Sequence, residues 1–369
     1  MQVKKLKLIN FRNYKNQDLS FSSNINVIYG DNGQGKTNIL EAIFLCASGR
    51  SHRTSKDSDL VMLNEPGYYI KLEADKEATG STIEISYKSE ERRKVRINEI
   101  PIKKIGELMG NLKVVIFSPE DLMVIKEGPA ERRRFMDITL SQLKPSYFYD
   151  LQQYMKILSH RNNLLKDMQF NKSLSDTLEI WNQNLINTGS RIIKTRKEFL
   201  EKLLVYVKDN HFKLTNQREE LELKYSPSVK IDGLKELGDI EDAFKKNIDR
   251  LKSKEIIKCT TLCGPQRDDY ELYINDKNLK QFGSQGQQRT AVLSVKLAEI
   301  DIMFEETGER PILLLDDVMS ELDENRQNYL LENIKNIQTF ITCTDSHLIK
   351  GKSTIAAKLY HVVNGQVIG

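Results

Sequence analysis

A glycine-rich segment at residues 30–37, Gly-Asp-Asn-Gly-Gln-Gly-Lys-Thr, matches the pattern G-x-x-x-x-G-K-[ST] of phosphate-binding loops. It follows a strand-like apolar run at residues 25–29 and precedes residues 37–47, whose apolar side chains recur at helical spacing. In such a strand–loop–helix unit, glycines let backbone N–H groups approach phosphate oxygens, and the helix dipole adds positive charge. The segment therefore predicts an α/β fold that binds a nucleoside triphosphate.

The loop also predicts which residues contact the nucleotide and its metal ion. Lys36 is expected to reach the β- and γ-phosphates of ATP and to take part in catalysis, and the Thr37 hydroxyl is expected to ligate Mg²⁺. The complete expected phosphate-binding set is Gly30, Asp31, Asn32, Gly33, Gln34, Gly35, Lys36 and Thr37.

A second apolar run, at residues 311–315, ends in the carboxylates Asp316 and Asp317. Asp316, at the end of the predicted strand, is placed to hold Mg²⁺ through its water shell. Asp317 would then orient or deprotonate the water that attacks the γ-phosphate. A buried strand with exposed acids at its end is the alternative, and the phosphate-binding loop favours the metal site.

The middle of the chain has a different pattern from its two ends. Between Pro145 and Pro227 it contains no proline and a single glycine, and its apolar residues recur at helical spacing. Because proline and glycine are the strongest helix breakers, this pattern favours two or more long helices. We therefore expect residues 1–130 and 255–369 to form an α/β lobe, and residues 131–254 to form a mostly helical lobe inserted into it.

Composition limits the partners and the compartment. Lys and Arg number 56 against 52 Asp and Glu, a formal net charge of +4, which excludes a polybasic binder and restricts any nucleic-acid contact to a local patch. The sequence shows neither an apolar run of membrane-spanning length nor a secretory signal, so we expect a cytoplasmic protein with no membrane contact. The 4 cysteines fit no zinc spacing and are expected to be reduced thiols.

Several further segments resemble one family of ATPases. Residues 283–289, Gly-Ser-Gln-Gly-Gln-Gln-Arg, resemble the signature motif of ATP-binding-cassette (ABC) ATPases, and Ser-Glu-Leu-Asp at 320–323 resembles their D-loop. The opening Leu-Ile-Asn-Phe-Arg-Asn-Tyr at 8–14 is similar to the start of structural-maintenance-of-chromosomes (SMC) proteins. With Gly-Pro-Gln-Arg-Asp-Asp at 264–269 and Arg-Arg-Arg-Phe-Met-Asp at 132–137, these segments resemble the bacterial RecF family over the whole chain.

This resemblance implies an SMC/ABC-type ATPase head, a P-loop fold with a mixed sheet, in which the helical lobe replaces a long coiled coil. It implies an ATP-dependent homodimer, in which the signature of one chain meets the γ-phosphate bound by the other. The signature residues are Ser284, Gln285, Gly286 and Gln287. It further implies an ATP contact by Arg12, weak DNA-linked ATPase activity, and a role in DNA replication, the SOS response and recombinational gap repair, with RecR and RecO as the mediators that load RecA.

The sequence departs from the ABC pattern in places. Asp317 stands where most of these ATPases have glutamate, and its shorter side chain predicts slow hydrolysis, suited to a switch. Gln285 replaces a signature glycine, which affects how closely that backbone approaches phosphate. The usual Q-loop glutamine is absent, with Glu120 or Asp121 as candidates for its metal-sensing role, and His347 fits a surface residue better than a phosphate-sensing switch histidine.

Basic residues cluster at a few places that could contact DNA. Such clusters bind the phosphate backbone by charge and with little sequence preference, so a duplex or a duplex-to-single-strand junction would serve. A solvated charged surface is the alternative for each cluster, and packing of the helical lobe is a further alternative for Arg132, Arg133 and Arg134. The candidates for DNA contact are Arg50, Arg53, Lys56, Arg92, Arg93 and Lys94.

Other functions also use a phosphate-binding loop of this kind. The main alternative is an ABC subunit that energises a membrane transporter, but such subunits lack a long helical insertion and the motif at 264–269. A subunit of an SMC-like repair nuclease would need a coiled coil longer than 369 residues can hold.

Overall fold

The computed structural model describes residues 1–76, 79–171, 174–345 and 357–368. The chain divides into two compact units, and we describe each by itself. The first unit comprises Met1–Asp121 and Lys296–Gly369, and the second comprises Leu122–Val295. Among the described helices, none is both long enough and apolar enough to cross a membrane.

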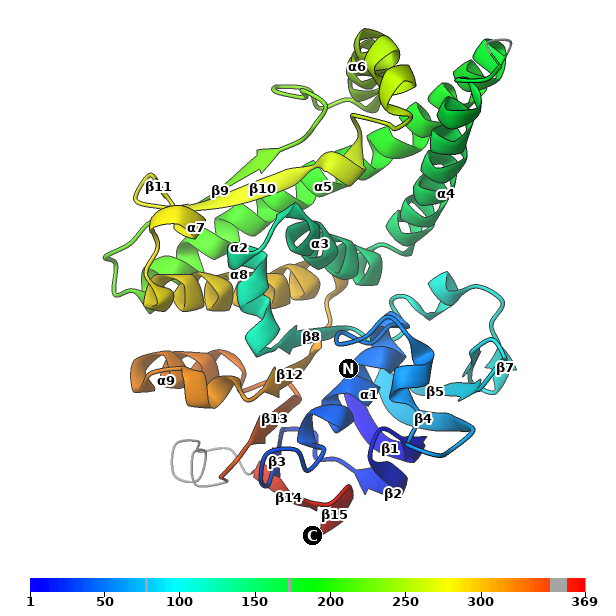
Figure 1. Ribbon diagram of the computed structural model, residues 1–369. Coiled ribbons are helices and arrows are strands. Elements are labelled where there is room, and N and C mark those ends of the chain that lie inside the picture. The colour runs from blue at the N-terminus through cyan, green and yellow to red at the C-terminus, as the bar shows by residue number, and fades with distance from the viewer. Residues whose placement is uncertain (77–78, 172–173, 346–356, 369) are drawn as a thin grey trace. The chain divides into compact units, whose positions relative to one another are not determined.

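The first unit contains two six-stranded sheets (Figure 1). One is antiparallel, with the order β2-β1-β4-β5-β6-β7, and the other, with the order β15-β14-β3-β13-β12-β8, is parallel except at β15. The antiparallel strands are β1 Gln2–Phe11, β2 Tyr14–Ser20, β4 Gly67–Lys76, β5 Thr79–Lys88, β6 Lys94–Ile97 and β7 Ile100–Pro101. The others are β3 Ile25–Tyr29, β8 Val114–Phe117, β12 Ile312–Asp316, β13 Thr339–Cys343, β14 Ala357–Val363 and β15 Gln366–Ile368.

The parallel sheet positions the ends of three strands side by side. Every residue of β8, β12 and β13 is buried, which explains why their sequences are mostly apolar instead of alternating. The order β3-β13-β12 brings the carboxyl ends of these strands to one sheet edge. Helix α1 (Lys36–Ser48) starts at that edge, directly after the loop that follows β3, and α9 (Glu324–Asn333) links β12 to β13.

The second unit combines long helices with a three-stranded antiparallel sheet of order β11-β10-β9 (Figure 1). Helix α5 has 40 residues and contains the glycine noted above, Gly189. A Cβ there would lie 2.6 Å from Phe244 and 2.8 Å from Tyr154, so glycine permits these aromatic rings to pack closely against α5. The elements are α2 Met123–Lys126, α3 Pro129–Leu143, α4 Pro145–Asp167, α5 Ser175–Leu214, β9 Leu221–Ser226, α6 Leu237–Lys258, β10 Asp269–Ile274, β11 Lys277–Asn278, α7 Leu279–Phe282 and α8 Gln285–Thr307, the last of which ends in the first unit.

The expected fold class, an α/β head with a mixed sheet and a helical lobe, is confirmed. The boundaries of the compact units differ from those expected at residues 130 and 255. Residues 255–295 fall in the second unit because β10 pairs with β9 across more than 40 positions. Such a long-range pairing leaves no trace in the local periodicity of a sequence.

Candidate nucleotide-binding site

The phosphate-binding loop, residues 30–37, lies between the end of β3 and the first turn of α1. Gly30 and Gly35 have positive φ angles of 150° and 113°. A Cβ on Gly30 would lie 2.4 Å from the carbonyl oxygen of Val362, and a Cβ on Gly35 would collide with the Asn13 side chain. The narrow turn therefore requires glycine at both positions. The exposed part of the loop consists of Asp31, Asn32 and Gly33.

Lys36 turns back across this loop. Its Nζ donates hydrogen bonds to the carbonyl oxygens of Gly30 (2.6 Å) and Asp31 (2.8 Å), and the residue is 8% exposed. The first turn of α1 contains no acidic side chain, so the positive end of its dipole faces the loop unopposed. A largely buried ammonium beside a helix N-terminus suits an anionic phosphate chain.

Residues outside the motif hold the loop in place. Asn13 Nδ2 donates to the Gln34 carbonyl oxygen (2.7 Å), and the Tyr14 hydroxyl donates to the Gly35 carbonyl oxygen (3.0 Å). On the C-terminal side, the Asn364 N–H donates to the Gln34 side-chain oxygen (2.6 Å). These residues were missed from the sequence, although the SMC-like segment at the start of the chain contains Asn13 and Tyr14.

Arg12, an expected ATP contact, is held mainly by acidic Glu41 of α1. Its Nε and Nη2 donate to the two carboxylate oxygens of Glu41 (2.9 and 2.7 Å), and its Nη1 donates to the Asp59 carbonyl oxygen (2.7 Å). Burial raises the pKa of Glu41, but hydrogen bonds from Arg12 and Ser51 together with the charges of Arg12 and Arg53 outweigh that effect, so the pKa lies below its usual value. The charged pair fixes the guanidinium against α1, and an ATP contact by Arg12 stays a prediction.

Asp316, at the end of β12, accepts hydrogen bonds from two threonines, one in the neighbouring strand β13 and one in the first turn of α1. The hydroxyls of Thr37 and of Thr342, in β13, each donate to its Oδ1 at 2.7 Å. Burial raises the pKa of Asp316, these hydrogen bonds act against the shift, and the nearby charge of Glu120 adds to it. A divalent cation would compensate this desolvated charge, and a hydroxyl with a carboxylate is the oxygen donor set that Mg²⁺ prefers. The residues therefore fit Mg²⁺.

Asp317 has a left-handed backbone, with a φ of 54°. Its N–H donates to Thr342 Oγ1 (2.9 Å), and the Ser320 hydroxyl donates to its carbonyl oxygen (2.7 Å) and lies 3.2 Å from Oδ1. Aspartate and asparagine accept this conformation more readily than most residues do. The conformation therefore gives a local reason for aspartate at a position where most ABC ATPases have glutamate.

The two acidic candidates for the Q-loop role have different surroundings. Asp121 is paired with buried Lys296 (3.1 Å) and accepts a hydrogen bond from the Ser118 N–H (2.7 Å), while burial raises its pKa. Glu120 is exposed, and its charge contributes to the raised pKa of Asp316. A metal-sensing role for Glu120 or Asp121 stays a prediction. His347 lies outside the described residues.

The signature segment lies at the start of α8, in the second unit. Ser284 and Gln287 form a reciprocal cap, in which Ser284 N–H donates to Gln287 Oε1 (2.9 Å) and Gln287 N–H donates to Ser284 Oγ (3.2 Å). Ser284 and Gln285 are exposed, and Gly286 is half-buried. The N-terminus of α8 is therefore capped by its own side chains, and Ser284 and Gln285 are accessible to solvent.

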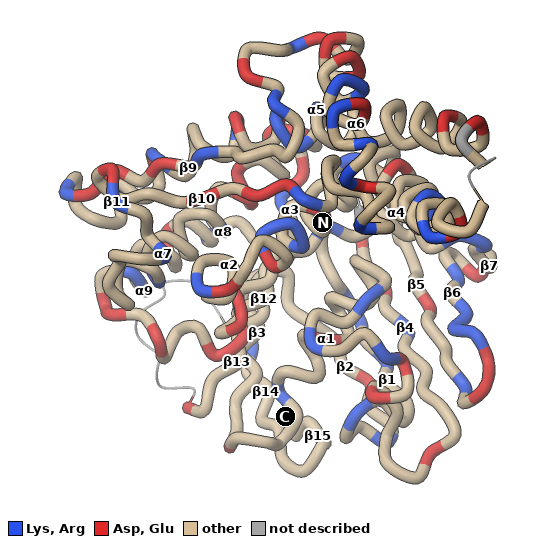
Figure 2. Tube along the Cα trace, turned by 45° about the horizontal axis from the view of Figure 1, so that its top comes forward, with Lys and Arg blue, Asp and Glu red and all other residues tan. Residues whose placement is uncertain are grey.

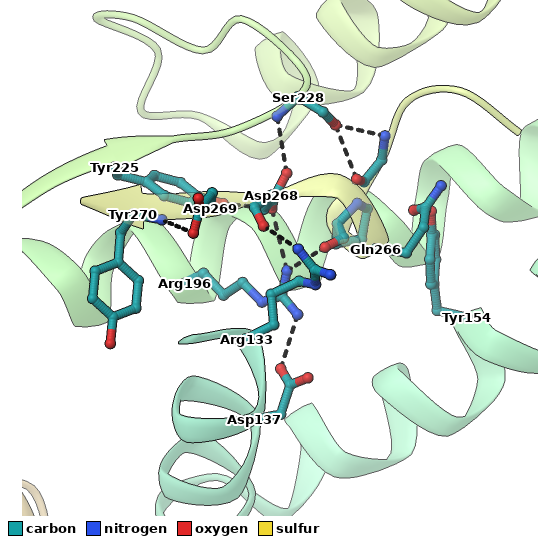
Figure 3. A network of polar contacts seen from close by, with 12 residues as sticks. Arg133, Asp137, Tyr154, Arg196, Tyr225, Ser228, Gln266, Asp268, Asp269 and Tyr270 are labelled. Atoms are coloured by element: carbon teal, nitrogen blue, oxygen red, sulfur yellow. Dashed lines mark hydrogen bonds and ion pairs between the residues drawn. The ribbon is translucent and has the colours of Figure 1, made fainter. Parts of the chain in front are cut away.

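The motif at residues 264–269 forms the centre of a buried charge network within the second unit (Figure 3). Arg196 of α5, with a side chain 2% exposed, pairs with Asp137 (2.8 Å) and Asp268 (3.3 Å). Asp268 also accepts hydrogen bonds from Tyr225 OH (2.7 Å) and the Ser228 N–H (3.0 Å). The network ties α3, α5 and β9 together, which gives this motif a structural task.

The basic clusters expected to contact DNA are partly neutralised. Arg93 pairs with Asp57 (2.9 Å), Lys94 with Glu91 (2.8 Å), and Arg53 with Glu41 (3.6 Å). The exposed members without an ion pair among the described residues are Arg50, Lys56 and Arg92. Arg132 and Arg133 pack inside the second unit, where Arg132 binds Asp269 (2.6 Å) and Arg133 donates to the Asp268 carbonyl oxygen (2.7 Å).

A basic stripe on α6 was not singled out from the sequence. It consists of Lys246, Arg250, Lys254 and Lys258, which are all exposed and recur every fourth residue. Blue segments along α6 in Figure 2 mark the Lys and Arg positions of this helix. Residues at this spacing are neighbours on a helix surface. No acidic partner of these side chains is found among the described residues, although Arg250 donates to Asn247 (2.6 Å). The four-residue spacing of these Lys and Arg residues in the sequence could have predicted the stripe.

Comparisons of sequence place the chain among known proteins. A family model described as the RecF/RecN/SMC N terminal domain matches residues 2–367. The chain is 56% identical over 353 residues to the DNA replication and repair protein RecF of Acetivibrio thermocellus, with 96% of each chain covered. It is 50% identical to the protein of that name from Ruminiclostridium cellulolyticum, with 100% of this chain and 99% of the relative covered.

Solved structures give the same result for the fold. A structure of the recombination mediator protein RecF-ATP in the RecFOR pathway matches with a TM-score of 0.93 at 39% identity, covering 100% of this chain and 97% of that chain. An Smc head domain derived from Pyrococcus furiosus matches with a TM-score of 0.56 at 17% identity, a likeness of fold alone. The resemblance seen in the sequence motifs is confirmed.

Proposed function

The chain belongs to the RecF family, and from this membership we propose that it is an ATP-dependent DNA-binding protein of recombinational gap repair. The observation that carries the proposal is the contact between the Thr37 hydroxyl and Asp316, which joins the phosphate-binding loop to the acidic strand end. The transporter alternative is not favoured, because relatives that match the full chain are named as repair proteins.

In this proposal the loop of residues 30–37 binds the phosphates of ATP through its backbone N–H groups. Lys36 exchanges its carbonyl partners for β- and γ-phosphate oxygens, and Thr37 and Asp316 hold Mg²⁺. When bound, Mg²⁺ supplies positive charge that offsets the charge developing on the γ-phosphate. Asp317 orients the attacking water from the end of a short side chain on a constrained backbone, so weak, slow ATPase activity follows.

We further propose that Ser284, Gln285, Gly286 and Gln287 act on the ATP of a second copy of the chain. An exposed helix N-terminus with an ordered cap offers N–H donors and a positive dipole end to the γ-phosphate. ATP then joins the dimer, and its hydrolysis removes the contact that favours the paired state. This makes hydrolysis a timer for release.

DNA is the proposed macromolecular ligand, bound through its backbone. The basic stripe and the exposed residues Arg50, Lys56 and Arg92 supply positive charge, which fits a duplex or a junction without sequence preference. Because the net charge is only +4, pairing two chains through ATP would raise the charge presented to DNA. RecR and RecO are the partners proposed from family membership, and the cytoplasm is the proposed location because bacterial DNA lies there.

Sedimentation of the wild type and of Lys36→Met, with and without ATP and then with a DNA duplex, tests this function. The wild type should dimerise and bind the duplex more tightly with ATP, whereas Lys36→Met should stay monomeric because it lacks the phosphate-binding ammonium. An ATP-independent oligomeric state and DNA affinity in the wild type would refute the proposal.

A further inference from the structure

The signature segment is connected to the end of helix α5 through a chain of polar contacts. Gln287 Nε2 donates to Glu219 Oε1 at 2.9 Å. The other oxygen of this carboxylate, Oε2, lies 3.3 Å from Nε2 of His211, in the last turn of α5. Nδ1 of His211 in turn lies 3.1 Å from Oγ of Ser294, in α8. The chain thus starts and ends on the signature helix.

Glu219 determines which way the Gln287 amide faces. The carbonyl oxygen of this amide accepts from Ser284 N–H, and its NH₂ group donates to Glu219. A rotated amide would set two donors against each other at Ser284 and two acceptors against each other at Glu219. The carboxylate therefore selects the orientation that keeps the reciprocal cap of Ser284 and Gln287 closed.

His211 in turn fixes Glu219. Its side chain is fully buried, and that of Glu219 is 23% exposed. At 3.3 Å from a carboxylate oxygen, His211 Nε2 is favourable only when it carries a hydrogen, since a bare ring nitrogen and a carboxylate oxygen are both acceptors. His211 Nε2–H and the Gln287 amide therefore both donate to this carboxylate. These two donors offset the negative charge of Glu219, which would otherwise disfavour a phosphate bound at the neighbouring signature.

We propose that Glu219 and His211 are positioning residues for the signature, which hold Gln287 and thereby keep Ser284 ordered for the γ-phosphate of the partner chain. The inference rests on the proposed function, in which the signature acts on the ATP of a second copy. Donors that are ordered before the phosphate arrives lose less entropy on binding than mobile ones do. Glu219 and His211 therefore strengthen ATP-dependent pairing without touching the nucleotide.

The test compares Glu219→Ala with Glu219→Gln and with Glu220→Ala, a control at the adjacent carboxylate, which pairs with Lys208 at 3.1 Å on the surface. Sedimentation measures ATP-dependent dimerisation, and a fluorescent ATP analogue measures binding to the monomer. Glu219→Ala should weaken dimerisation about tenfold, the effect of losing hydrogen bonds to a charged group. Glu219→Gln should restore it, because the new amide still accepts from Gln287 and donates to a bare His211 Nε2. Monomer ATP affinity should be unchanged in all three, and the melting temperature should be unchanged in Glu219→Gln and Glu220→Ala.

A second pair of variants covers the case in which Glu219→Ala perturbs folding. Gln287→Met removes the amide at equal length and should weaken dimerisation as Glu219→Ala does, and the double variant should lose no more than either single one. The positioning role is overturned if Glu219→Ala dimerises with ATP as strongly as the wild type does. It is also overturned if Glu219→Gln weakens dimerisation as much as Glu219→Ala. Ser284→Arg separates the two proposals: if it too dimerises normally, the signature does not act in the partner site, and the proposed function fails.

Discussion

The Thr37 hydroxyl donates a 2.7 Å hydrogen bond to Oδ1 of Asp316, although 279 residues separate the two in the chain. The sheet order β3-β13-β12 creates this contact, since the two residues follow or end strands on either side of β13. Thr342, in β13 itself, donates to the same oxygen. The hydroxyl and carboxylate proposed to hold Mg²⁺ are therefore already next to each other.

We expect Asp316→Asn to lose the gain in ATP affinity that Mg²⁺ provides, by at least about tenfold, because an amide cannot replace a charged oxygen ligand. Asparagine can still accept from both threonine hydroxyls, so the fold should be kept. Binding of a fluorescent ATP analogue in Mg²⁺ and in EDTA measures the effect. Glu332→Gln, at an exposed carboxylate of α9, should leave the Mg²⁺ effect unchanged; an undiminished Mg²⁺ effect in Asp316→Asn would exclude Asp316 from the site.

Asp317→Asn should slow ATP hydrolysis at least about tenfold, because it removes the carboxylate proposed to orient or deprotonate water. Asparagine accepts the left-handed backbone at this position as aspartate does, so ATP binding and dimerisation should be kept. The dimer should therefore persist longer after ATP is added. Single-turnover rates report the chemical step, and a rate equal to wild type would remove Asp317 from the mechanism.

Replacing Lys246, Arg250 and Lys254 of the basic stripe by glutamine should weaken duplex binding in ATP. Each lost phosphate contact reduces the slope of log K against log salt by about 0.9, so the slope should fall by about 2 to 3. The control is the double variant Lys88→Gln, Lys94→Gln. Both lysines pair with Glu91, so their loss should lower the salt slope less. If the control lowers the slope and the stripe variant does not, DNA contacts the cluster first predicted from the sequence.

The buried pair Arg161–Glu255 should be required for stability of the helical unit. The two groups are 2.6 Å apart, with side chains 1% and 0% exposed. Glu255→Ala leaves the arginine charge buried without its carboxylate and should lower the free energy of unfolding by about 3–5 kcal/mol. Asp209→Ala, which breaks the exposed pair with Lys213, should cost at most about 1 kcal/mol. Urea unfolding measures both, and equal losses would contradict the assignment.

The sequence was sufficient to predict the strand–loop–helix unit and the acidic strand end. Both patterns are local, and parallel strands must bring their carboxyl ends to one edge. Partners supplied by distant segments were not predictable. Nothing near Arg12 indicates that Glu41 binds its guanidinium, and nothing near Asp268 indicates that Arg196 of α5 pairs with it.

Charge clusters were the least predictable part of the candidate site. A run of basic residues shows where charge is concentrated along the chain, but the fold decides which charges are paired. Arg93 and Lys94 find acidic partners, whereas the four residues of the basic stripe, distributed along one helix face, have none among the described residues. Helical spacing is therefore a better guide to an exposed basic surface here than adjacency in sequence.

The most direct test of an ATP-bound dimer with shared sites is to mix two inactive variants. Lys36→Met lacks a working phosphate-binding loop, and Ser284→Arg lacks a working signature, so neither should hydrolyse ATP alone. In the mixed dimer, the loop of one chain meets the intact signature of the other. ATPase activity should then reappear, up to about half of the wild-type value, since the mixed dimer contains one intact site of two and neither variant forms such a site alone. If the mixture is as inactive as its components, the signature does not complete the ATP site of a partner chain.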